Sequence, residues 1–212
     1  MISKNKQLPW HHFGIGRALL AVAVVCLSSL AIPLTPYADT DEASASQLHP
    51  AKQTILGLYV TARDAYEMWK AAPDKVKILD VRTPEEVIFV GHAAMAWNVP
   101  VAAQSYQWDA EKQQFPMNPL PDFVTRAQTI AKPDDILLVM CRSGGRSAIA
   151  VNMLAKAGFT TVYNITDGME GDAVKDPGSV FNGQRLVNGW KNSGLPWTYK
   201  VDSDQMVLPT EH

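Results

Sequence analysis

From residue 55 to residue 165 the chain alternates short apolar runs with longer stretches in which apolar residues recur at helical spacing. The short runs predict strands at 56–60, 76–81, 97–99, 136–140 and 161–165. The longer stretches predict helices that begin after Thr61 and after Thr83, and helices over 123–130 and 147–156. Strands that alternate with helices indicate an α/β fold of three layers, with a central parallel sheet flanked by helices on both faces.

Two of the predicted helices begin with recognisable capping residues. Thr61 is followed three residues later by Asp64, which is a capping-box pattern. Thr83 precedes a proline and two acidic residues, and this order is typical of a helix start because proline fits the first position and acids favour the first turn. Residues 103–121 are polar and contain prolines, so we expect an irregular excursion there.

The amino-terminal segment has the pattern of an export signal. Residues 18–34 are almost wholly apolar, and the head before them contains Lys4, Lys6 and Arg17 but no acidic residue. A small-residue exit follows at Ala43-Ser44-Ala45, as signal cleavage requires. We therefore expect an exported, periplasmic protein. The alternative is a membrane anchor that keeps the apolar stretch, which is at the lower length limit for spanning a bilayer.

These patterns divide the chain into four parts. Residues 1–45 are the expected signal peptide and the start of a linker, and residues 46–54 complete that linker. Residues 55–198 form the expected α/β domain, and residues 199–212 a carboxyl-terminal tail.

Composition excludes several classes of protein. The chain has 212 residues, of which 47% are apolar and 19% charged, so it is neither disordered nor a disulfide-stapled miniprotein. Lys and Arg number 19 against 21 Asp and Glu, so no basic field attracts nucleic acid. The five histidines do not cluster with Cys141 at ligand spacing, and we expect neither a metal nor a cofactor.

Cys141 is the candidate reactive residue. The other of the two cysteines, Cys26, lies in the apolar stretch, so a mature exported chain has one thiol and no internal disulfide. The apolar run 136–140 leads directly into the cysteine loop, which is Cys141-Arg142-Ser143-Gly144-Gly145-Arg146-Ser147. Glycines let successive amides turn inward, while the next helix and two arginines add positive charge. These features favour a negative charge on the sulfur at neutral pH.

The cysteine loop resembles the active-site loop of single-domain rhodaneses, which are sulfurtransferases. Two upstream blocks are also similar to that family, namely residues 78–86 and Gly91-His92 with Asn98-Val99-Pro100. Downstream, Gly194-Leu195-Pro196 near Trp190 resembles its closing segment. The blocks occur in the family's order and cover residues 55–198, so the resemblance implies a rhodanese-like domain.

The resemblance implies that Cys141 takes sulfur from a small anionic donor such as thiosulfate and carries it as a persulfide. A thiol or a cyanide-like acceptor, or a protein thiol, then removes that sulfur. Loop amides from Arg142 to Ser147 stabilise the negative charge, and Arg146 and Arg142 orient the donor. By the same resemblance Asp80 and Arg82 support the loop. His92 is interpreted as a structural turn residue, because an ionised thiol needs no general base.

Two other functions remain open at this point. One is a persulfide carrier or a sulfur-sensing binding module that does not turn over. The other, more distant, is a cysteine-dependent phosphatase or arsenate reductase. Phosphatase loops carry five residues between cysteine and arginine, whereas four separate Cys141 from Arg146, which suits a sulfur atom better.

Two segments depart from the family pattern. In 103–121, Tyr106, Trp108 and Phe115 lie in a polar context, where surface padding is favoured over a cleft lining. Residues 172–189 form an insertion whose acidic residues match no EF-hand spacing, which favours a solvated loop over a calcium site. An added loop can extend a site, so this insertion leaves the acceptor open.

Overall fold

The computed structural model describes residues 48–209. The predicted signal peptide and apolar stretch lie outside these residues. Five parallel strands form the central sheet in the order β1-β8-β7-β2-β4. Their bounds are Tyr59–Val60 (β1), Val162–Ile165 (β8), Ile136–Met140 (β7), Val76–Asp80 (β2) and Trp97–Asn98 (β4). The strand predicted at 136–140 is confirmed with the same bounds.

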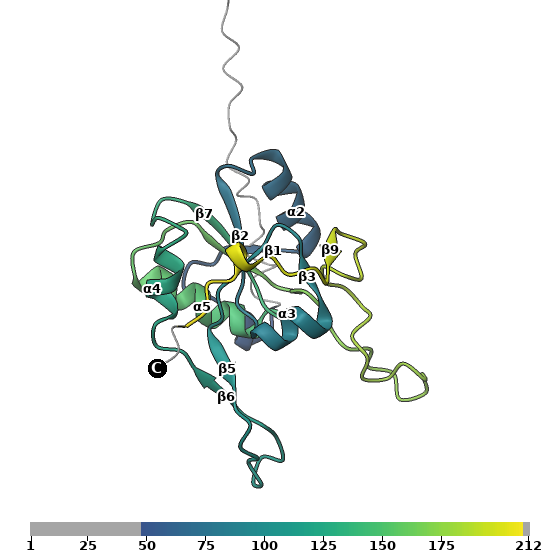
Figure 1. Ribbon diagram of the computed structural model, residues 1–212. Coiled ribbons are helices and arrows are strands. Elements are labelled where there is room, and N and C mark those ends of the chain that lie inside the picture. The colour runs from purple at the N-terminus through teal and green to yellow at the C-terminus, as the bar shows by residue number, and fades with distance from the viewer. Residues whose placement is uncertain (1–47, 210–212) are drawn as a thin grey trace, which may run out of the picture. The chain divides into compact units, whose positions relative to one another are not determined.

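Helices cover both faces of this sheet. They span Ala62–Ala71 (α2), Pro84–Val90 (α3), Phe123–Gln128 (α4) and Gly145–Lys156 (α5). Successive strand residues point to opposite faces. In β7, Leu137 and Val139 pack with α4 and α5, whereas Leu138 and Met140 pack with α2. Figure 1 shows α2 across the sheet from α4 and α5. The predicted three-layer α/β fold is therefore confirmed.

The predicted capping box at Thr61 is present, and the predicted cap at Thr83 is also a capping box. At the start of α2, the Thr61 hydroxyl accepts a hydrogen bond from the Asp64 amide, and the Asp64 carboxylate accepts one from the Thr61 amide. Thr83 and Glu86 make the same exchange at the start of α3. Helix α5 begins at Gly145, two residues before the predicted start, because the last residues of the cysteine loop already form its first turn.

The prediction of a wholly irregular excursion over 103–121 is wrong in part. Strands β5 (Ala102–Gln104) and β6 (Met117–Pro119) pair antiparallel and form a hairpin that projects from the domain (Figure 1). All three residues of β6 are exposed. Strand pairing there depends on main-chain hydrogen bonds rather than on one buried face, so the hydrophobic pattern carries no strand signal.

The last strand of the predicted domain and the segments that flank the domain pack onto the rest of it. Strand β9 (Trp197–Thr198) pairs with β3 (His92–Ala93), and the Val207 amide donates to the Asn98 carbonyl of β4. On the amino-terminal side the short helix η1 (Pro50–Lys52) packs on α5. Between residues 48 and 209, none of the helices has both the length and the apolar character that a membrane crossing requires.

Candidate functional site

Cys141 lies at the carboxyl edge of the sheet, directly after the central strand β7. It is a free thiol and only 2% exposed. In open α/β sheets, ligands bind at this edge, where strands end and loops begin. The fold therefore puts the one described cysteine where a binding loop is expected.

Two groups of the cysteine loop contact the sulfur. The Gly144 amide donates a hydrogen bond to Cys141 Sγ at 3.2 Å, and the Ser147 hydroxyl lies 3.4 Å from the same atom. Both contacts are buried. Within residues 48–209 these are the hydrogen bonds to the sulfur, so the geometry supplies one amide and one hydroxyl where the sequence suggests a ring of amides.

Ser147 connects the sulfur to a buried amide on the neighbouring strand. Its hydroxyl also lies 2.6 Å from Asn164 Oδ1 of β8. Asn164 Nδ2 donates to the Gly144 and Lys52 carbonyls, which identifies Oδ1 as the acceptor. A hydroxyl carries one proton, so Ser147 donates either to Asn164 or to the sulfur. When the sulfur is negatively charged, turning that proton toward Sγ stabilises the charge.

The loop backbone is held by a second segment, residues 166–170. The Met169 and Glu170 amides donate to the carbonyls of Cys141 and Arg142 at 2.8 and 2.9 Å. Gly144 and Gly168 both adopt positive φ, and a Cβ on either would collide with backbone atoms of the opposite segment. Glycine is therefore required on both sides of this close approach.

Arg146 forms a double ion pair with Glu86 of α3. Both guanidinium Nη atoms lie 2.6 Å from a Glu86 oxygen, and the two side chains are 20% and 17% exposed. Burial alone would raise the pKa of Glu86, but the hydrogen bonds and charge of Arg146 hold it below the ordinary value. Burial likewise disfavours the charged Arg146, but Glu86, with a smaller contribution from Cys141, keeps its pKa raised. The charge of Arg146 is thus largely balanced within the protein.

We expect Glu86→Gln to destabilise the protein by about 2 kcal/mol at neutral pH, because a charged bidentate contact becomes a neutral one while the helix cap is kept. The pKa of Glu86 lies below its ordinary 4.5, so its contribution is complete above pH 4.5 and is lost as the pH falls through the lower folded value. Urea unfolding of both proteins across this range measures the difference. A difference in the free energy of unfolding that stays constant with pH would show that the charge of Glu86 plays no part.

Asp80 and Arg82 form a buried ion pair at the end of β2, next to β7. Arg82 Nε and Nη2 donate to the Asp80 carboxylate at 2.6–3.0 Å, and Nη2 also donates to the Gly91 carbonyl. The two side chains are 0% and 1% exposed. Burial disfavours the charge of Arg82, but Asp80 outweighs it and raises the Arg82 pKa. The Val81 amide between them donates to the Met140 carbonyl, which ties this turn to the strand that carries Cys141.

The remaining predicted loop residues and His92 differ in exposure and in position relative to the cysteine loop. Arg142 is exposed, whereas Ser143 and Gly145 are half-buried. The His92 ring nitrogens face the carbonyls of Ala93 and Lys200, so this residue joins β3 to the carboxyl-terminal segment and lies outside the cysteine loop.

Sequence reasoning missed Glu86, Asn164 and Gly168 as parts of this site. Glu86 was visible only as a capping residue. Asn164 had a usable signal, because an amide side chain inside the apolar run 161–165 needs a buried partner. Gly168 lies in a turn far from the loop in sequence, so only the close approach of the two backbones reveals its role.

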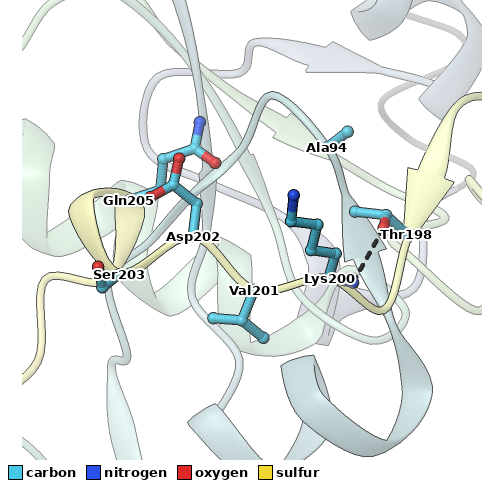
Figure 2. A pocket seen from close by; sticks show the side chains of 7 residues that line it. All are labelled: Ala94, Thr198, Lys200, Val201, Asp202, Ser203 and Gln205. Carbon is cyan, nitrogen blue, oxygen red and sulfur yellow. Dashed lines mark hydrogen bonds between the residues drawn. The ribbon is translucent and has the colours of Figure 1, made fainter.

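A cavity of about 570 Å³ lies elsewhere in the domain (Figure 2). The turn after β3 and residues 198–205 line it, and Lys200 and Asp202 supply its charged groups. No residue of the cysteine loop contributes to its wall. In the described part of the chain, His, Cys, Asp and Glu form no group of three or more with the arrangement of a metal site.

Comparison with known proteins gives concordant matches. The family model described as "Rhodanese-like domain" matches residues 61–173. An uncharacterized protein of Rickettsia conorii is 31% identical over 140 residues, covering 66% of this chain and 96% of its own. "Thiosulfate sulfurtransferase 16, chloroplastic" of Arabidopsis thaliana is 39% identical over 120 residues, covering 57% and 78%. The crystal structure of Rv0390 from M. tuberculosis superimposes with a TM-score of 0.51 at 27% identity, covering 66% and 96%.

Proposed function

The chain belongs to the rhodanese-like domain family, and from this premise we propose that it is a sulfurtransferase that moves sulfane sulfur through a persulfide on Cys141. The donor is a small sulfur anion such as thiosulfate, and the acceptor is a nucleophile. The observation that carries the proposal is the contact of Cys141 Sγ with the Gly144 amide and the Ser147 hydroxyl at the end of β7. The name of the Arabidopsis thaliana relative supports the same chemistry.

In the first step the Cys141 thiolate attacks the outer sulfur of thiosulfate. A bond forms between Sγ and that sulfur, the donor's S–S bond breaks, and sulfite leaves with the bonding electron pair. The Gly144 amide and the Ser147 hydroxyl stabilise the charge on the attacking sulfur. Because Cys141 is only 2% exposed, a compact donor fits this step best.

The two loop arginines have different roles in this scheme. Arg146 shares its charge with Glu86 and fixes the start of α5 against α3. Arg142 is exposed, so its charge is the one that meets an approaching anion. We therefore assign donor attraction and orientation mainly to Arg142, and assign to Arg146 the positioning of the cysteine loop against α3 through Glu86.

In the second step an acceptor nucleophile attacks the outer sulfur of the persulfide. The S–S bond to Cys141 breaks, and the cysteine leaves as the thiolate that begins the next cycle. The same two donors that stabilise the starting thiolate stabilise this leaving group.

A carrier would perform the first step and hold the persulfide until a protein partner removes it. Four residues between Cys141 and Arg146 favour sulfur over a phosphoryl group.

Loading and turnover test this proposal. Incubation with thiosulfate is expected to add the mass of one sulfur atom to Cys141, and cyanide is expected to remove it as thiocyanate. Catalytic thiocyanate release supports the enzyme, whereas a stable adduct without turnover supports the carrier. If the purified protein gains no sulfur and releases no thiocyanate, the proposal is wrong.

We also propose that the protein acts after export to the periplasm. The support is the basic head, the apolar stretch 18–34 and the small-residue exit, all of which lie outside the described residues. Retention of the apolar stretch as a membrane anchor is the alternative.

A further inference from the structure

An apolar cavity of about 520 Å³ lies beside the cysteine loop. Helix α5 forms one wall and the β5–β6 hairpin with the residues after it forms the other. We call it the α5 cavity. Its lining residues are Val101, Ala102, Met117, Pro119, Leu120, Pro121, Arg146, Ile149 and Met153. Cavities of this size and character hold small molecules in many proteins.

The α5 cavity is continuous with the cysteine loop through Arg146. Arg146, Ile149 and Met153 are spaced three and four residues apart, so they lie in one row on α5. Arg146 heads this row and also belongs to the cysteine loop that carries Cys141. A molecule that lies along the row therefore has one end at the cysteine loop.

The far wall exists because of the hairpin. Met117 Sδ lies 3.4 Å from Arg146 Nη1, which closes the cavity at its loop end. Ile149 is 58% exposed and Met117 37% exposed. Apolar side chains on both sides of a partly open cavity indicate a site that buries apolar surface when it is filled.

The charge of the α5 cavity excludes an anion as its main occupant. Arg146 is its one charged lining residue, and Glu86 already pairs with both of its Nη atoms. Small sulfur anions have no apolar surface to bury here. The cavity of Figure 2 differs, because the charged residues Lys200 and Asp202 line it and no residue of the cysteine loop does.

We propose that the α5 cavity holds the hydrocarbon body of an acceptor thiol, with its sulfur directed toward Cys141. This proposal rests on the proposed sulfurtransferase function. The thiol loses its proton to solvent, and its thiolate attacks the outer sulfur of the Cys141 persulfide. The Cys141 S–S bond breaks, Cys141 becomes a thiolate, and the acceptor leaves as a new persulfide. The persulfide's outer sulfur lies about 2 Å beyond Sγ, so the acceptor need not reach the covered Sγ itself.

The acceptor step can be measured alone. Protein loaded from thiosulfate and freed of excess donor is mixed with ethanethiol, butanethiol or hexanethiol, and the rate of persulfide loss is followed by mass. We expect the second-order rate constant to rise roughly threefold for each added methylene, since each leaves water for an apolar wall. Equal rate constants for all three thiols would overturn the proposal.

A variant of the cavity wall localises the effect. Ile149→Asp puts a charge on the rim at an exposed helix position and is expected to remove most of the chain-length dependence. The matched control is Val180→Asp, an 86% exposed apolar residue that does not line the cavity, and it should keep that dependence. Loss of the dependence in both variants, or in neither, would contradict the assignment.

A binding measurement separates this proposal from the proposed function. In Cys141→Ser protein with methyl-labelled methionines, hexanethiol is expected to shift the Met117 and Met153 methyl signals, and ethanethiol at equal concentration much less. Buried Met169, which packs in the core on the other face, serves as the internal control. If the wild type fails to load sulfur but these shifts occur, the reaction is wrong and the binding site stands. If neither methionine signal moves, the cavity proposal fails.

Discussion

Cys141→Ser is expected to abolish transfer of sulfur from thiosulfate to cyanide, with a loss on the order of 10⁴-fold or more. A serine hydroxyl ionises far less readily than a thiol and cannot form a persulfide. No neighbouring group in the described loop offers a second nucleophile, because the contacts to Sγ come from an amide and a hydroxyl. Thiocyanate release measured over a range of thiosulfate concentrations gives the size of the loss.

The fold of this variant should persist. Serine is close to cysteine in size. Its hydroxyl can accept the hydrogen bond that the Gly144 amide donates to the sulfur in the wild type. We expect a change of about 1 kcal/mol or less in the free energy of unfolding. The matched control, made in the full-length chain that keeps residues 1–45, is Cys26→Ser at the other cysteine of the sequence, which should keep full activity. If activity survives in Cys141→Ser and disappears in Cys26→Ser, Cys26 is the nucleophile and the proposal is wrong.

Asp80→Ala is expected to lower the free energy of unfolding by about 3–5 kcal/mol, because it leaves the buried charge of Arg82 without its partner. Arg82 is 0% exposed and makes three of its hydrogen bonds to this carboxylate. Its remaining contact, to the Gly91 carbonyl, cannot neutralise the charge. Denaturant unfolding at neutral pH measures the loss.

A double variant distinguishes the unpaired charge from simple loss of packing. In Asp80→Ala with Arg82→Met, both charges are gone, so part of the lost stability should return. Lys112→Ala, which removes an exposed ion pair with Asp109, should change stability by about 0.5 kcal/mol or less. If the double variant is less stable than Asp80→Ala, the unpaired buried charge of Arg82 is not the cause of the stability lost in Asp80→Ala. The loss would then come from the packing and hydrogen bonds of the two side chains.

Local patterns were sufficient for the elements that build the framework. The run 136–140 is apolar at every position because strand β7 is buried on both faces, and its bounds were predicted without error. The starts of α2 and α3 were predictable because a capping box needs only residues three apart. Such signals depend on near neighbours, which the sequence displays directly.

Partnerships between distant residues were beyond these patterns. Glu86 and Arg146 are 60 residues apart, and nothing in either segment identifies the other as its partner. The same holds for Ser147 with Asn164 and for Gly168 with the backbone of Cys141. The hairpin partner of β5 was missed because β6 has no buried face to mark it.

By itself the sequence determined the order along the chain of the central-sheet strands and the four α-helices, and the position of the one thiol that follows a buried strand and precedes a glycine-rich turn. These features follow from residues close together in the chain, whose spacing decides which side chains can be buried and which amides can be capped. Only the tertiary structure decided that Arg146 forms an ion pair with Glu86 and that the Ser147 hydroxyl lies between Asn164 Oδ1 and the sulfur. It also decided that the β5–β6 hairpin and α5 enclose an apolar cavity. Those outcomes depend on contacts between segments that only the folded chain brings together.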